Sequence, residues 1–162
     1  MDSNYLLNFV IPQGPTGPTG PSSGLSAYGG KYNNTTQTIN LTIGSSSQVP
    51  LPNALENSNT TYTTANSINI SQSGIYEINY YINMSAAVAT TVTTAVRNNG
   101  VNIPTTIISR ALSVGVGSIY SGSTIVSLDS GDVIDMAISA LLAVGVTLGS
   151  GVNATLTVKR IS

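Results

Sequence analysis

The sequence predicts an all-β protein built as a two-sheet sandwich of the jelly-roll kind. From about Leu25 onward, β-branched and aromatic residues alternate with polar residues at period two, and apolar residues with a helical period are hard to find. About eight to ten such segments are separated by turns rich in glycine, asparagine and serine. Strands with one apolar and one polar face are typical of antiparallel sheets that bury one side each.

The clearest strand is "GIYEINYYINM", residues 74–84. Its apolar face carries Tyr76, Ile78, Tyr80, Ile82 and Met84, and its polar face carries Glu77, Asn79, Tyr81 and Asn83. Two shorter stretches earlier in the chain alternate in the same way. The first has Ile39, Leu41 and Ile43 on one face, and the second has Ile68 and Ile70. We expect these faces to form part of the core, which places Tyr76 and Tyr80 inside and leaves Tyr81 outside.

Two strand–turn–strand units follow. Residues 90–103 predict a hairpin, because Asn99-Gly100 supplies the two positive-φ positions of a type I′ turn. Residues 123–139 predict a second unit around the turn Asp129–Asp132, followed by one apolar face made of Ile134, Met136, Ile138, Ala140 and Leu142. The last predicted strand, in "NATLTVKRI", points Ala154, Leu156 and Val158 inward.

Composition excludes several classes of function. Charged residues make up only 7% of the 162 residues, the net charge is −1, and the five Lys and Arg are dispersed, so neither nucleic acid nor an anionic membrane is a predicted partner. The chain has no cysteine and no histidine, which excludes the common zinc, copper and non-haem iron sites and the Ser-His-Asp and Cys-His nucleophiles. We therefore predict no cofactor and no enzymatic activity. No apolar run is long enough to span a bilayer, so we predict no membrane insertion, and the N-terminus lacks the basic region of a secretion signal.

The chain divides into three parts. Residues 1–13 form a leader, residues 14–23 form a short collagen-like tract, and residues 24–162 form the β domain. The tract has glycine at every third position, at Gly14, Gly17 and Gly20, each followed by proline. A collagen triplet is useful only when three chains wind together, because glycine must sit at their shared axis. The tract therefore favours a homotrimer.

Three stretches of the β domain are apolar on both faces and built from small residues, at 85–92, 111–117 and 140–148. A single sandwich buries only one face of each sheet, so the second apolar face needs another partner. We predict that these stretches form the trimer interface. The candidate interface residues are Val88, Val92, Val114, Val116, Leu141, Val144, Val146 and Leu148.

Several segments resemble the collagen-like exosporium glycoproteins of the bacterial spore surface, of the BclA type. The resemblance lies in "SAYGG", "SQSGIYEINYYINMSAAV", "VRNNGVNIP", "LDSGDVIDMAI" and the closing "LLAVGVTLGSGVNATLTVKRI". It covers about residues 24–162 and implies a C-terminal jelly roll of the complement/tumour-necrosis-factor type that forms a homotrimer. Members of this family usually carry dozens of triplets, and this chain has three, so no stalk length is implied.

The resemblance also implies a function and a location. Such proteins are structural components of the spore surface, made in the mother cell and assembled without export, and an apolar leader helps to seat them on the exosporium. Residues 1–13 resemble that leader, whose partners would be proteins of the exosporium basal layer. Threonine in the third position of the triplets is glycosylated in this family, which makes Thr16 and Thr19 the candidate O-glycosylation sites.

Two other functions of the same fold stay open. One is a trimeric adhesin or carbohydrate-binding head, whose polar loops, such as residues 53–64, would recognise a host matrix protein or a glycan. The other is the tip of a phage tail fibre, since such fibres also combine Gly-Pro-x triplets with trimeric β domains.

The few charged residues have ordinary structural interpretations. Asp129, Asp132 and Asp135 form either a turn or a calcium site, and the spacing favours the turn. Glu56 and Glu77 are the only glutamates, and nothing in the sequence pairs them as glycosidase carboxylates. The basic residues Arg97, Arg110, Lys159 and Arg160 are interpreted as isolated surface charges.

Overall fold

The computed structural model describes residues 24–162, so the predicted leader, the collagen-like tract and the candidate glycosylation sites Thr16 and Thr19 lie outside the described residues. The described residues form strands and one short 3₁₀ helix, and no helix among them could cross a membrane. The elements are β1 (Tyr28–Asn33), β2 (Thr38–Leu41), β3 (Ser46–Gln48), β4 (Asn53–Ala54), β5 (Thr60–Thr61), β6 (Ile68–Ile70), β7 (Gly74–Ala86), β8 (Thr90–Asn98), β9 (Val101–Asn102), η1 (Pro104–Thr106), β10 (Ile108–Leu112), β11 (Ser118–Leu128), β12 (Val133–Ala140), β13 (Val144–Leu148) and β14 (Ala154–Arg160).

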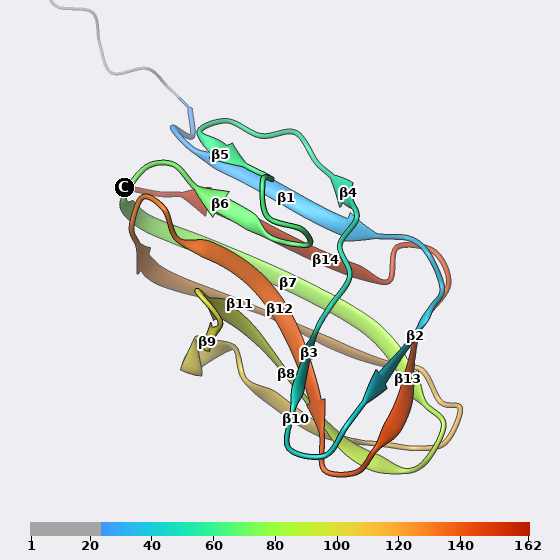
Figure 1. Cartoon of the computed structure of the whole chain (residues 1–162). Coiled ribbons are helices and arrows are strands. Elements are labelled where there is room, and N and C mark those ends of the chain that lie inside the picture. The colour runs from blue at the N-terminus through green and yellow to red at the C-terminus, as the bar shows by residue number, and fades with distance from the viewer. Residues whose placement is uncertain (1–23) are drawn as a thin grey trace, which may run out of the picture.

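The strands form two antiparallel sheets that pack face to face, which confirms the predicted all-β sandwich (Figure 1). In the first sheet, which we call sheet A, β7 pairs along one side with β11 and along the other with β14 and β13. β1 continues sheet A beside β14, and β2 continues it beside β13. In sheet B, β12 lies between β8 and the two short strands β6 and β3, and β10 pairs with the far side of β8.

The core lies between the sheets and is built by the alternation that the sequence predicts. All five apolar-face residues of β7 are buried, and so are Ala154, Leu156 and Val158 of β14. Opposite them, sheet B contributes Ile134, Met136 and Ile138 of β12. Tyr80 is buried deep enough that its hydroxyl donates to the Thr106 carbonyl at 2.7 Å, and burial raises its pKa.

Two apolar residues predicted to face the core are instead exposed, because their strands end before them. β12 ends at Ala140, and Leu142 follows it in a loop with half of its surface exposed. β2 ends at Leu41, and Ile43 projects from the turn in which Gly44 has a φ of 74°.

Both predicted turns are present. Asn99 and Gly100 have φ values of 51° and 81° and connect β8 to β9, as a type I′ turn requires. At the second turn, the Asp132 amide donates to the Asp129 carbonyl at 3.1 Å, and Gly131 has a φ of 99°. Glycine is needed at this position because other residues are strained at that dihedral.

The structure corrects half of the predicted interface. Val92, Val146 and Leu148 are fully buried, and Val144 is 7% exposed, so these four side chains belong to the core of their own chain. The prediction failed because it took the runs 85–92 and 140–148 as apolar on both faces, whereas Val92 lies on the buried face of β8. In fact β13 alternates its buried valines and leucine with Gly145 and Thr147. The other four residues, Val88, Val114, Val116 and Leu141, are exposed in loops, and their role in an interface stays a prediction.

Candidate functional site

The outward side of sheet A is a regular surface of four adjacent strands, which we call face A. Its residues align in rows because β1, β14, β7 and β11 pair in register across the sheet. One row is Tyr32, Thr155, Tyr81 and Ser121, the next is Gly30, Thr157, Asn79 and Ser123, and the third is Tyr28, Lys159, Glu77 and Ile125. Hydroxyl, amide and aromatic groups therefore dominate face A.

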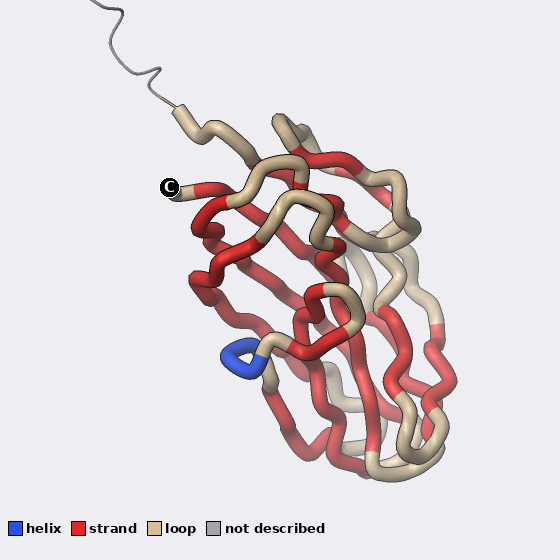
Figure 2. The backbone as a smooth tube through the Cα atoms, turned by 60° about the vertical axis from the view of Figure 1, so that its left-hand side comes forward, coloured by secondary structure: helices blue, strands red, loops and turns tan. Residues whose placement is uncertain are grey.

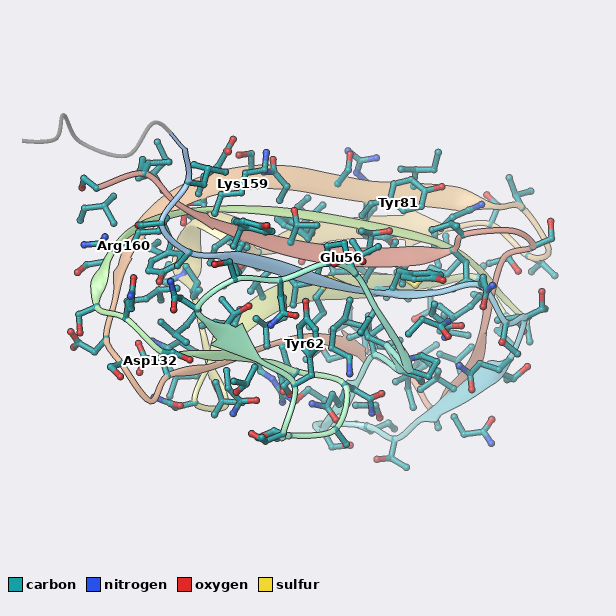
Figure 3. The ribbon with its side chains drawn as sticks, turned by 90° about the horizontal axis from the view of Figure 1, so that it is seen from above. Glu56, Tyr62, Tyr81, Asp132, Lys159 and Arg160 are labelled. Atoms are coloured by element: carbon teal, nitrogen blue, oxygen red, sulfur yellow. The ribbon has the colours of Figure 1, made fainter. Side chains whose placement is uncertain are left out.

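Face A carries almost no charge. In the three rows, Lys159 and Glu77 are the only charged residues, and their Nζ and Oε2 atoms lie 3.6 Å apart, so the charges balance each other. Both side chains are partly exposed, and such a pair contributes little to stability. Lys159 and Tyr81 lie along one side of the molecule, away from Tyr62 and Asp132 (Figure 3). A surface of this kind suits a partner that is neutral and has a fixed shape.

Face A is hollowed in three places. A cavity of about 170 Å³ lies beside Leu25 and Tyr28, and one of about 300 Å³ lies between Tyr32 and Val152. A third of about 110 Å³ is lined by Tyr81 and its neighbours. Hollows next to aromatic rings can receive protruding side chains of a partner.

One border of face A is the edge strand β11, which pairs with β7 on one side only. Proteins usually protect a sheet edge with proline, charged residues or a short strand. β11 has none of these features, since it is eleven residues long and contains no proline and no charged residue. Its outward side chains Ile119 and Ile125 are 50% and 63% exposed. Arg110 of β10 covers part of the edge, because its Nη1 donates to the Ile119 carbonyl at 3.0 Å. The rest of the edge is free to contact another molecule.

The described chain begins at one end of face A. Arg160 Nη1 donates to the Ser26 hydroxyl at 2.9 Å, and its Nε donates to the Ser73 carbonyl at 3.1 Å. These bonds hold the start of the described chain against the end of β14 and the beginning of β7. Leu25, next along the chain, lines the first hollow of face A.

The acidic cluster forms a turn and a separate ion pair. The Asp132 carboxylate accepts bonds from the Asn98 and Asn99 side-chain amides at 2.8 Å each and from the Asp129 amide at 2.9 Å. Partial burial alone would raise the pKa of Asp132, but these three hydrogen bonds prevail and lower it. Asp135 instead accepts two bonds from Arg97 at 2.7 Å. Within residues 24–162, no three acidic side chains gather as metal ligands.

The remaining singled-out residues have separate structural roles. Glu77 pairs with Lys159, and Glu56 lines the hollow beside Leu25. The prediction that Tyr76 lies in the core is confirmed, and its hydroxyl donates to the Gln72 carbonyl at 2.8 Å. The four basic residues contact different partners and form no common patch. The prediction of isolated surface charges is wrong for Arg97, whose side chain is only 16% exposed and forms a bidentate pair with Asp135.

Sequence reasoning missed face A as a site. It identified Tyr81 as outward, but not Tyr28, Tyr32, Ile119 or Ile125. A signal was present in "SIYSGSTIVSL", where isoleucines alternate with large buried residues so that both sides of the strand carry apolar groups. The predicted interface was instead assigned to the small apolar runs at 85–92, 111–117 and 140–148.

Comparison with known structures supports the same fold. Murine APRIL, in a crystal structure at pH 5.0, is similar with a TM-score of 0.61 and 12% identity, over 83% of this chain and 98% of that one. The globular domain of zebrafish complement 1qA has a TM-score of 0.54 and 13% identity, over 84% and 98%. Eiger TNF from S. frugiperda has a TM-score of 0.54 and 9% identity, over 85% and 93%. At these identities the likeness shows the fold alone, a jelly roll of the complement/tumour-necrosis-factor type.

A search of curated protein sequences finds no match. The family model of the BclA C-terminal domain, in contrast, matches residues 29–162, which is nearly the whole described domain. The match agrees with the resemblance found in the central strand, the hairpin and the closing strand. The chain therefore belongs to the BclA C-terminal domain family.

Proposed function

We propose that this protein is a structural component of the bacterial spore surface whose β domain is a self-assembling head, a homotrimer. The observation that carries the proposal is face A, an almost uncharged surface with three hollows, bordered by the unprotected edge of β11. A near-neutral protein with such a surface gains by covering it. The role is architectural, and no chemistry is assigned to any side chain.

A ring of three subunits requires two different, complementary patches on each subunit. Such a contact is heterologous, with one patch of each chain meeting the other patch of the next, and the rotation must close. The β1 side of face A supplies a hollowed patch around Tyr28 and Tyr32, and its β11 side, at the sheet edge, supplies protruding side chains at Ile119 and Ile125. We infer that the edge of one subunit packs against face A of its neighbour.

The sequence before the domain supports three as the number of subunits. Collagen triplets at Gly14, Gly17 and Gly20 serve only a three-chain assembly. The described chain starts at one end of face A, where Arg160 holds Ser26, so packing through face A brings three such starts toward one axis. This location suits a head that sets the register of the tract preceding it.

Family membership supports the location on the spore. BclA-type proteins are associated with the exosporium, and the leader would contact proteins of its basal layer. Glycans on Thr16 and Thr19 would then decorate the tract between leader and head. These finer assignments rest on the family and on the sequence of residues 1–23.

Sedimentation of the full chain tests the head. We expect a trimer at micromolar concentration. Ile125→Lys should dissociate it, because removing the new ammonium group from water in a buried contact costs several kcal/mol even beside Glu77, which weakens association by more than about 100-fold. In the isolated chain the new lysine lies opposite Glu77 and does not oppose folding. The matched control Val101→Lys, on an equally exposed residue of the β8–β9 hairpin, should remain a trimer. A monomeric wild type, or an equal effect of both variants, would exclude this contact.

A further inference from the structure

The end of the sandwich farthest from the N-terminal segment is an apolar surface, which we call the apolar tip. It consists of the loops that connect β2 to β3, β7 to β8, β10 to β11 and β12 to β13 at the lower end of the sandwich in Figure 1, and Figure 2 also shows loops at this end. Their residues are 42–45, 87–89, 113–117 and 141–143. Hydrogen bonds hold the loops at one end: the Gly115 amide donates to the Ala86 carbonyl at 3.0 Å, and the Ala87 amide donates to the Gly145 carbonyl at 3.1 Å. β7 runs from the N-terminal end to this tip, so its thirteen residues separate the two ends by about 40 Å.

Every residue of these four loops is exposed, although many are aliphatic. Six large aliphatic side chains project from them, each between 49% and 72% exposed: Ile43, Val88, Val114, Val116, Leu141 and Leu142. Soluble proteins rarely gather so many apolar side chains at one place, and such a patch marks an interaction surface. Because these residues lie in loops beyond the ends of the strands, their side chains do not reach the core of their own chain.

The charge distribution indicates what the apolar tip contacts. None of its loop residues is charged, whereas the opposite end carries Asp129 and Asp132 in the turn between β11 and β12 and Arg160 at the end of β14. The loops also lack Lys and Arg, so they offer nothing to an anionic headgroup. They contain no aromatic residue, the type of side chain that most often anchors a specific protein contact. Their polar side chains are the hydroxyls of Thr42, Ser45 and Ser113, and those of Thr42 and Ser45 bond to each other. The complementary partner is therefore uncharged and mostly apolar.

A second copy of the chain fits this surface poorly. Six half-exposed side chains offer on the order of 500 Å², whereas each partner of a standard protein interface buries about 800 Å². The tip is also formed by separate loop apices, so two tips would touch at few points. The acyl chains of a lipid layer require neither a large area nor a continuous surface. They deform around separate loops, and each inserted methylene group adds to the binding free energy independently.

We propose that the apolar tip inserts its aliphatic side chains into the acyl-chain boundary of an uncharged lipid surface. Insertion is shallow, because residues 113–117 and 141–143 lie outside the strands and only some of their amides bond within the chain, so the other backbone groups need water or headgroups. Three tips in one trimer engage the surface together, which multiplies the affinity of each. The gain from three tips rests on the proposed trimer, but the insertion of a single tip does not, because the tip is distinct from face A.

Flotation of the full chain with phosphatidylcholine vesicles tests the proposal. The tip variant Ile43→Ser with Leu141→Ser should bind at least about tenfold more weakly than the wild type, because two large apolar side chains no longer insert. The control variant Val101→Ser with Ile161→Ser removes two apolar side chains that are also exposed but lie away from the tip. It should bind like the wild type. Both variants keep the leader, so any lipid binding by residues 1–13 cancels in the comparison.

Further arms separate the alternatives. A second tip variant, Val88→Ser with Val114→Ser, should weaken binding in the same way if the first one folds poorly. Replacing a third of the lipid by phosphatidylglycerol, or adding salt, should change nothing. The proposal is overturned if the wild type does not float, if the control variant loses binding equally, or if binding requires the anionic lipid. It is also overturned if sedimentation without vesicles shows that the tip variants alone dissociate the trimer, because the tip would then belong to the subunit contact.

Discussion

The ion pair on sheet B should contribute more to stability than any other charged group of the domain. Asp135 is 7% exposed and accepts three hydrogen bonds, from Arg97 Nε and Nη2 at 2.7 Å and from Gln48 Nε2 at 2.8 Å. The same Gln48 amide donates to the Ser67 hydroxyl at 3.1 Å. The pair therefore links β8 and β12 to β3 and to the segment that precedes β6.

Asp135→Asn keeps the shape of the side chain and removes its charge. Breaking a buried pair costs about 3–5 kcal/mol because the other charge stays buried without a partner. The Arg97 side chain retains 16% exposure, so water relieves part of that cost. We expect a loss of about 3 kcal/mol in the free energy of unfolding, the lower end of this range, which for a domain of this size lowers Tm by about 6–12 °C.

Urea unfolding at one fixed protomer concentration measures this loss, because association between copies would otherwise add a concentration-dependent term. The matched control is Asp129→Asn on an exposed turn carboxylate, with an expected change below about 0.5 kcal/mol. In the double variant with Arg97→Met, the uncompensated charge is gone, so we expect a coupling of about 2 kcal/mol. A loss for Asp135→Asn no larger than that for Asp129→Asn, or strictly additive effects with Arg97→Met, would refute this reasoning.

Three smaller effects follow from the same structure. Folding lowers the pKa of Asp132, so the stabilisation from its carboxylate is present above the ordinary pKa near 3.8 and is lost as the pH falls through the lower pKa of the folded state. Asp132→Asn should therefore cost about 1–2 kcal/mol in the free energy of unfolding at pH 7. It should also reduce the pH dependence of unfolding in acid. Gly131→Ala places a side chain at a φ of 99° and should cost about 1–3 kcal/mol in the same urea assay, whereas Ser130→Ala should cost less. Tyr80→Phe removes the hydroxyl bonded to the Thr106 carbonyl and should lower the free energy of unfolding by about 1 kcal/mol, and a thermal melt shifted by less than a degree would contradict it.

The sequence predicted those parts of the fold in which local chemistry and packing agree. Residues 74–84 have only one apolar face, so period two alone determines which side chains of β7 enter the core. Asn99-Gly100 predicts its turn because few other residue pairs adopt two positive φ values. Neither prediction needed knowledge of any neighbouring strand.

Prediction failed where both faces of a segment carry apolar residues. In β11, Tyr120 and Leu128 enter the core while Ile119 and Ile125 remain outside, and the alternation alone could not decide between the two sets. Leu142 has the correct parity for the buried face of β12, yet no glycine, proline or asparagine signals that the strand ends at Ala140. Such boundaries are determined by how the sheets close, which is information from the rest of the chain.

Face A and the apolar tip share a lack of charge but differ in the chemistry that a partner would meet. Face A offers aromatic rings, ordered rows of hydroxyl and amide groups and shallow open hollows, so its partner must match it in geometry, as we propose for a second copy of the chain. The apolar tip offers mainly aliphatic groups on exposed loops, beside a hollow of about 490 Å³ that Ile43 and Leu141 line together with serine and threonine hydroxyls. Ile125→Lys should consequently distinguish the function of face A from that of the apolar tip. A dissociated chain keeps its tip and should still bind phosphatidylcholine vesicles, but more weakly than the trimer, because the cooperation of three tips is lost.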